Sequence, residues 1–81
     1  MDRTHYYVVY EDGAWKIQCE GENSEPYMRR SEAFKDAVGL AHLDEQNGRE
    51  ADVIVQGADD VFRPRWHSGQ DIYPPPLVPE L

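Results

Sequence analysis

The chain has 81 residues, 40% hydrophobic and 30% charged, which is the composition of one small soluble domain. Sixteen acidic against eight basic residues give a net charge of -8, which repels phosphate backbones and anionic membrane surfaces and disfavours both as partners. A single cysteine excludes an internal disulfide, and no apolar run approaches the roughly 20 residues of a transmembrane helix. With no signal-peptide pattern at the N-terminus, the expected location is cytoplasmic.

The first predicted element is a β-hairpin around Asp12-Gly13. Residues 6–11 and 14–19 are rich in β-branched and aromatic side chains, which favour strands. Asp-Gly is typical of a type I′ turn, whose two central residues both need positive φ, and this turn fixes the register of the pair. One face of the hairpin is then assigned to the core: Tyr6, Val8, Tyr10, Trp15, Ile17 and Cys19. The opposite face carries Tyr7, Val9, Lys16 and Gln18.

A helix is predicted over residues 31–48, after a polar loop at residues 20–30. Apolar residues recur at spacings of three and four, as in Phe34, Val38 and Ala41, and make one stripe that faces a core. Ser31 is the expected N-cap, and Asn47-Gly48 closes the helix because Gly tolerates the left-handed backbone of a C-terminal cap.

Two further strands are predicted at residues 51–56 and 61–66, joined by the turn GADD. Pairing across a four-residue turn places Val55 opposite Phe62, Val53 opposite Pro64 and Ala51 opposite Trp66 on the core face. The same register places Ile54 opposite Arg63 and Asp52 opposite Arg65 on the other face. Because Pro64 has no N–H to donate, this strand is expected at an edge of the sheet.

The predicted fold is α+β with the element order ββαββ. One helix covers one face of a four-stranded antiparallel sheet of order 2-1-3-4, reached by a right-handed crossover. Residues 1–68 form the domain, and residues 69–81 form an extended Pro-rich tail. Three alternatives stay open for the tail: it is solvated, it docks in an aromatic groove of a partner, or it folds back with Tyr73 as an anchor.

Several short motifs together resemble a known family. They are the hairpin VVYEDGAWKI with Glu20-Gly21 after it, the helix sequence RSEAFKDAVGLA, the segment ADVIVQGADDVF, and the ending SGQDIYPPP. The whole is similar to a family of small bacterial proteins, the domain of unknown function family 2188, over roughly residues 5–76. That family usually has Gly in its last turn, where this chain has Asp60. The resemblance implies no activity and no catalytic residue.

No constellation in the sequence indicates catalysis or a cofactor. His5, His42 and His67 lack the short spacing of a zinc motif, and the acidic neighbours of Cys19 disfavour a reactive thiolate. The carboxylates lie in polar, turn-rich segments, which is typical of a solvated surface. There is no glycine-rich phosphate loop and no GxSxG elbow. The chain is therefore interpreted as non-enzymatic, without a metal or another cofactor.

The uncovered face of the sheet is the most informative feature. An apolar centre with a polar rim suits a binding surface, although the same residues also suit a solvent-exposed sheet. The leading hypothesis is protein–protein association through this face, with itself or with a partner, and the alternative is binding of single-stranded RNA by the same face. The sequence identifies no particular partner or pathway. The predicted binding residues are Tyr7, Val9, Lys16, Ile54, Val61, Arg63 and Arg65.

Overall fold

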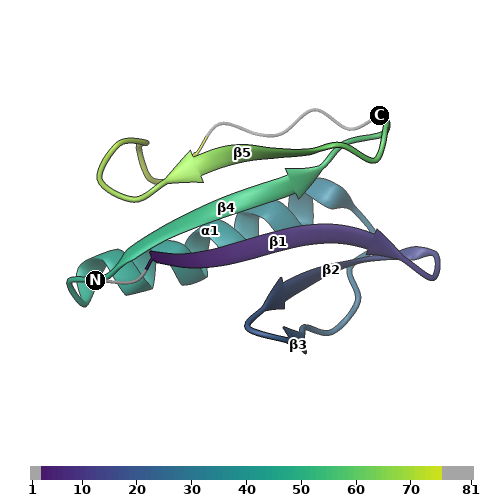
Figure 1. The fold of residues 1–81 in the computed structure, drawn as a ribbon, viewed down its shortest axis with the longest axis horizontal. Helices are drawn as coiled ribbons and strands as arrows, with labels where there is room; N and C mark the ends of the chain where they lie inside the picture. The colour runs from purple at the N-terminus through teal and green to yellow at the C-terminus, as the bar shows by residue number, and fades with distance from the viewer. Residues whose placement is uncertain (1–2, 76–81) are drawn as a thin grey trace.

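The computed structural model describes residues 3–75. In this part of the chain, one helix, α1 (Arg30–Gln46), covers one face of a mixed five-stranded sheet (Figure 1). The order in the sheet is β3-β2-β1-β4-β5, with β1 and β4 parallel and the other neighbours antiparallel. The strands are β1 (Arg3–Glu11), β2 (Ala14–Cys19), β3 (Glu22–Asn23), β4 (Glu50–Gln56) and β5 (Phe62–His67).

The predicted class, α+β with one helix on a sheet, is confirmed, but the predicted four-stranded antiparallel sheet is wrong. The number, direction and order of the strands all differ, because the segment expected as a loop pairs with β2. Ser24 N donates to Ile17 O at 2.8 Å, and Trp15 and Tyr27 exchange two backbone bonds of 3.0 and 2.7 Å. Residues 22–27 therefore run back along β2 and return the chain to the end of the sheet where β2 began. The helix then runs back along the sheet, and β4 emerges parallel to β1 (Figure 1).

The β1–β2 hairpin has the predicted register. Asp12 and Gly13 have φ values of 53° and 81°, as a type I′ turn requires, and Val8 lies opposite Ile17. Both of these aliphatic side chains are buried in the core beneath the helix.

The β4–β5 register is shifted by one residue from the prediction. The connecting loop runs from 57 to 61, closed by a bond from Gly57 N to Val61 O at 2.9 Å, so Gln56 lies opposite Phe62. Asp60 in this loop has a left-handed φ of 64°, the conformation that glycine adopts most readily. A slip of one residue exchanges the two faces of a strand. Phe62 and Pro64 therefore lie on the face away from the helix, and Arg63 lies opposite Val55.

A β-bulge between Val53 and Ile54 adds a second residue to this slip, and the slip of two restores the predicted faces at the end of β5. Trp66 pairs with Val53 and regains the core face, and it is the largest side chain that is fully buried among the described residues. His67, not Arg65, then lies opposite Asp52. The bulge thus decides which β5 side chains reach the core and which face solvent.

The helix begins one residue earlier than predicted. Arg29 is its N-cap, with extended φ and ψ of -128° and 144°, so Ser31 lies in the first turn instead of capping it. The helix ends at Gln46, and Gly48 has the left-handed φ of 79° expected after a helix. Phe34 is buried as expected, whereas Trp15 is only partly buried. The small residues Ala33, Ala37 and Ala41 are fully buried, so the helix packs closely on the sheet. No helix within residues 3–75 has the length and apolarity needed to cross a membrane.

The described end of the chain lies against α1. The indole Nε1 of Trp66 donates to the carbonyl of Ile72 at 2.9 Å, and the Tyr73 ring stacks on His42 with centroids 4.0 Å apart. Gly69 N donates to the Glu45 carboxylate from the same segment. Of the region predicted as a tail, residues 76–81 lie outside the described residues.

Replacing Gly39 with alanine is expected to raise the free energy of unfolding by about 1 kcal/mol, because Ala is the better helix former. A Cβ at this position would meet only the Tyr73 hydroxyl, at an ordinary contact distance of 4.0 Å. Urea unfolding checks this, with Gly48→Ala as a control that should lose stability, since Gly48 has positive φ. A destabilised Gly39→Ala variant would show that Tyr73 needs the space.

Candidate functional site: the open face of the sheet

The candidate site is the face of the sheet opposite α1, called here the open face. In Figure 1 the helix lies behind β1 and β4, so this face is turned toward the viewer. Strand alternation and the observed register decide which side chains occupy it. Its residues are Arg3, His5, Tyr7, Val9, Glu11, Ala14, Lys16, Gln18, Glu50, Asp52, Ile54, Gln56, Phe62, Pro64 and His67.

Two aromatic rings form the centre of the open face. Tyr7 and Phe62 are 39% and 45% exposed, and their rings meet edge to face with centroids 6.2 Å apart. The His5 ring lies 6.3 Å from Tyr7 on the other side. Val9, by contrast, is only 7% exposed, so it adds little accessible area to the open face. Partly exposed aromatic side chains of this kind are enriched where proteins bind one another.

The structure brings four of the seven predicted binding residues onto this face: Tyr7, Val9, Lys16 and Ile54. Val61 lies in the loop before β5. Arg63 lies opposite Val55 on the other face, where its guanidinium pairs with Asp59 at 2.8 and 3.1 Å. Arg65 occupies the bulge and is exposed. Phe62 was missed because the predicted register placed it in the core.

A row of polar side chains crosses three neighbouring strands at one end of the open face. His5, Asp52 and His67 lie directly opposite one another on β1, β4 and β5. The Asp52 carboxylate accepts bonds from His67 Nδ1 at 2.7 Å and from Arg3 Nη1 at 2.6 Å, and His5 Nδ1 lies 3.5 Å away. Asp52 is 7% exposed. Burial raises the pKa of its carboxyl, but the bonds and charges of His67 and Arg3 outweigh burial, and the pKa is lowered.

A carboxylate that orients an imidazole is also part of many general-base sites, where a nucleophile lies nearby. The Ser68 hydroxyl, next in the chain, is occupied by a bond from Ala51 N at 2.9 Å. Burial, followed by the charges of Glu20 and Asp44, raises the pKa of the Cys19 thiol, which disfavours the nucleophilic thiolate. Within residues 3–75, no three histidine, cysteine or carboxylate side chains are arranged to hold a metal ion.

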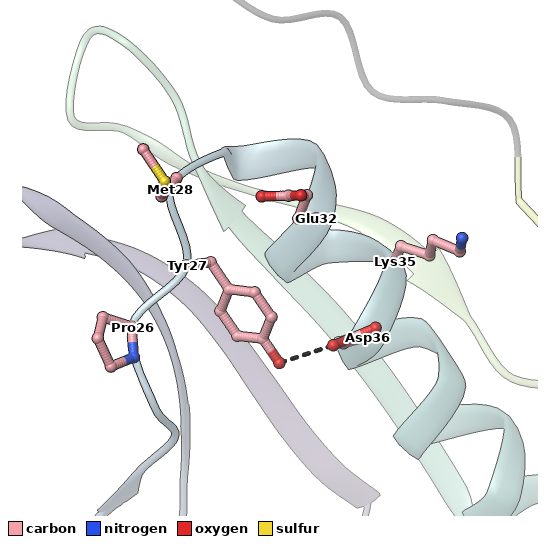
Figure 2. Close-up of a pocket in the computed structure, with 6 residues that line it drawn as sticks. All are labelled: Pro26, Tyr27, Met28, Glu32, Lys35 and Asp36. Carbon is pink, nitrogen blue, oxygen red and sulfur yellow. Dashed lines mark hydrogen bonds between the residues drawn. The ribbon is translucent and has the colours of Figure 1, made fainter.

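Cavities on the described surface lie beside the open face and beside α1. One of about 320 Å³ adjoins the open face at its β3 end, where the Tyr7 ring and the side-chain amides of Gln18 and Asn23 line it. The other, of about 410 Å³, lies beside the first turns of α1 (Figure 2).

The cavity beside α1 is less suited to a ligand. The Tyr27 hydroxyl donates to Asp36 at 2.8 Å across it, and burial together with this bond raises the pKa of Tyr27 to about 12. The Lys35 side chain extends away from Tyr27 (Figure 2). Tyr27 and Asp36 are thus bonded to each other and Lys35 points away from them, so the open face with its adjoining cavity is the stronger candidate.

Comparison with family models matches residues 6–68 to the family described as "Uncharacterized protein conserved in bacteria (DUF2188)". The match begins within β1, at Tyr6, and runs past the end of β5, so it includes the helix, both turns between paired strands and most of the open face. No curated protein and no solved structure matches the chain. Asp60, where the resemblance led us to expect Gly, has the left-handed backbone that Gly adopts most readily. The chain belongs to this family of uncharacterized bacterial proteins.

Proposed function

We propose that this protein is a non-enzymatic interaction module of the cytoplasm that associates through its open face, most simply with a second copy of itself. The observation that carries the proposal is the exposed Tyr7–Phe62 pair on an uncovered sheet face. Small soluble domains seldom leave contiguous aromatic surface bare, and a chain with a small core gains stability when it buries more.

The edges of the sheet favour association through the face. β3 is only two residues long, and the other edge strand, β5, carries Pro64 between Arg63 and Arg65. Short strands, prolines and charges at an edge hinder strand-to-strand pairing between molecules.

The charge distribution is compatible with a second copy despite the net charge of -8. On the open face, Lys16 pairs with Glu11, and Arg3 pairs with both Glu50 and Asp52. Much of the excess acid lies instead in residues 20–46, which form the β3 edge and the helix: Glu20, Glu22, Glu25, Glu32, Asp36, Asp44 and Glu45. Two open faces can therefore meet without placing these acids against one another.

The size of the face also suits such an interface. The described chain measures 35 × 27 × 20 Å, and the sheet lies across the two longer dimensions (Figure 1). A standard interface buries roughly 800 Å² per partner, an area on the scale of this face.

Single-stranded RNA is the second candidate partner. Exposed Tyr7 and Phe62 rings on an open sheet favour it, since unpaired bases stack on such rings. The net charge of -8 opposes it. Binding to a single-stranded oligonucleotide that weakens steeply with salt would favour RNA over self-association.

The double variant Tyr7→Thr, Phe62→Thr is expected to weaken self-association by about tenfold or more, because central aromatic residues carry much of the energy of an interface. Threonine preserves the strand preference, so the fold should persist. Sedimentation at several concentrations measures the effect. Met28→Thr is the matched control, since Met28 is 93% exposed but lies away from the open face, before α1. A wild type that is monomeric at the highest concentration would overturn self-association.

A further inference from the structure

The segment after β5 contacts the domain at a few separate points. The indole Nε1 of Trp66 donates to the main-chain carbonyl of Ile72 at 2.9 Å, and the Tyr73 ring stacks on His42 with 5° between the ring planes. The Tyr73 hydroxyl lies over Gly39, where an added Cβ would be 4.0 Å from it. Gly39, His42 and Trp66 are called here the α1–β5 site, because they belong to these two elements.

The α1–β5 site and the segment that contacts it differ in how firmly the fold holds them. Trp66 is 1% exposed within the core, and the other two residues of the site lie within α1. By contrast, residues 69–74 are all exposed, with Ile72 at 72% and Tyr73 at 49%. A terminal segment that buries little surface opens at a small fraction of the free energy of global unfolding. The segment can therefore leave the site while the domain stays folded.

The groups that the site contacts are present in many peptides. The indole N–H of Trp66 bonds to a main-chain carbonyl, which every residue offers, and the imidazole of His42 stacks on the flat face of an aromatic ring. Pro74 follows the aromatic residue Tyr73. Because proline fixes its own φ, such a segment loses less chain entropy when it binds. An aromatic residue followed by proline is thus the pattern that fits this site.

We infer that the α1–β5 site binds an aromatic–proline segment of another polypeptide, in competition with the chain's own residues 69–75. The site includes the helix layer and is separate from the open face, so the inference does not depend on self-association. The chain's own Ile72 is only six residues from Trp66, which gives the internal competitor an effective concentration of about 1 mM or more. A partner segment must therefore make further contacts to replace it. The net charge of -8 favours a segment that is basic outside this pattern.

The test is fluorescence anisotropy of a labelled peptide with the sequence of residues 68–75, to which the full chain is added. The variant Tyr73→Ser removes the stacked ring of the internal competitor. We expect it to bind the peptide with a dissociation constant about tenfold or more below that of the wild type, because the site is vacated more often. Tyr73→Leu, which keeps an apolar side chain but cannot stack, is the second variant if the first folds poorly. Circular dichroism verifies the folding of each variant.

Matched controls identify the site. The same peptide with the Tyr73→Ser change should bind neither the wild type nor the variants. Combining His42→Ala with Tyr73→Ser should abolish binding, whereas combining Tyr7→Thr, on the open face, with Tyr73→Ser should preserve it. No binding to Tyr73→Ser or Tyr73→Leu at up to about 1 mM protein, or binding that persists after His42→Ala, would overturn the inference. Neither result bears on self-association through the open face, which sedimentation measures separately.

Discussion

Replacing Trp66 with alanine is expected to lower the free energy of unfolding by about 3–5 kcal/mol, the usual cost of removing a fully buried aromatic side chain. Trp66 is 1% exposed, and its indole also donates to the carbonyl of Ile72. A domain of this length has only about 5 kcal/mol of total stability, so the variant should be largely unfolded without a stabilising partner.

Urea unfolding followed by far-UV circular dichroism measures this loss, with Trp15→Ala as the comparison. Trp15 is only partly buried, with Arg30 over its ring at 5.9 Å, so its replacement should cost less. Trp66→Phe should fall between alanine and wild type, because it keeps most of the apolar area and loses the hydrogen bond to Ile72. An unchanged midpoint in Trp66→Ala would contradict the bulge that directs this side chain inward.

The second large effect is expected for Asp52→Asn, which should lower the free energy of unfolding by about 2 kcal/mol at neutral pH. The variant removes the charge that Arg3 and His67 share and leaves their hydrogen bonds weaker. Folding lowers the pKa of the Asp52 carboxyl. The contribution of its charge to the free energy of unfolding is therefore present above the unfolded pKa of about 3.9, and it is lost as the pH falls through the folded value.

The difference between wild type and Asp52→Asn should therefore shrink in strong acid. Urea midpoints at neutral pH and at about pH 2 test this, since few carboxylates stay charged at the lower value. Asp60→Asn is the control: Asn tolerates the left-handed backbone of that exposed position, so stability should change little. A gap between wild type and Asp52→Asn that persists unchanged in acid would show that Asp52 acts through shape and not through charge.

Much of the fold follows from local signals in the sequence. Asp12-Gly13 permits one tight turn, and this turn alone fixes the pairing of Val8 with Ile17. The spacing of Phe34, Val38 and Ala41 marks the buried side of the helix.

The features that the sequence did not predict depend on contacts between distant segments. The pass from 22 to 27 is polar and has no strand pattern, and it is held by backbone bonds to β2. The β4–β5 register depended on whether Asp60 would adopt a left-handed backbone and lengthen the loop. A single added residue there exchanged the faces of Phe62 and Arg63, and the bulge that follows returned Trp66 to the core face.

The candidate site was predictable to the same extent as the strands that carry it. Tyr7 and Ile54 were placed correctly because β1 and β4 alternate regularly. The row formed by His5, Asp52 and His67 joins three strands. It could be recognised only once the registers of both the β1–β4 pair and the β4–β5 pair were known. One signal was available: His5 and Tyr7 are two residues apart, so the prediction that exposes Tyr7 also exposes His5.

The parallel pairing of β1 with β4 has a consequence for how the chain folds. The β1–β2 hairpin and the helix form from neighbouring residues, whereas β2, β3, the whole helix and their connections separate Arg3 from Glu50, its partner across the sheet. Closing so long a segment costs chain entropy before any contact of β4 compensates for it. The central pair of the sheet is thus the one that local structure cannot build alone. Residues 22–27, which run back along β2, set the direction in which β4 enters the sheet. The folding of this small domain therefore depends on its most distant contacts.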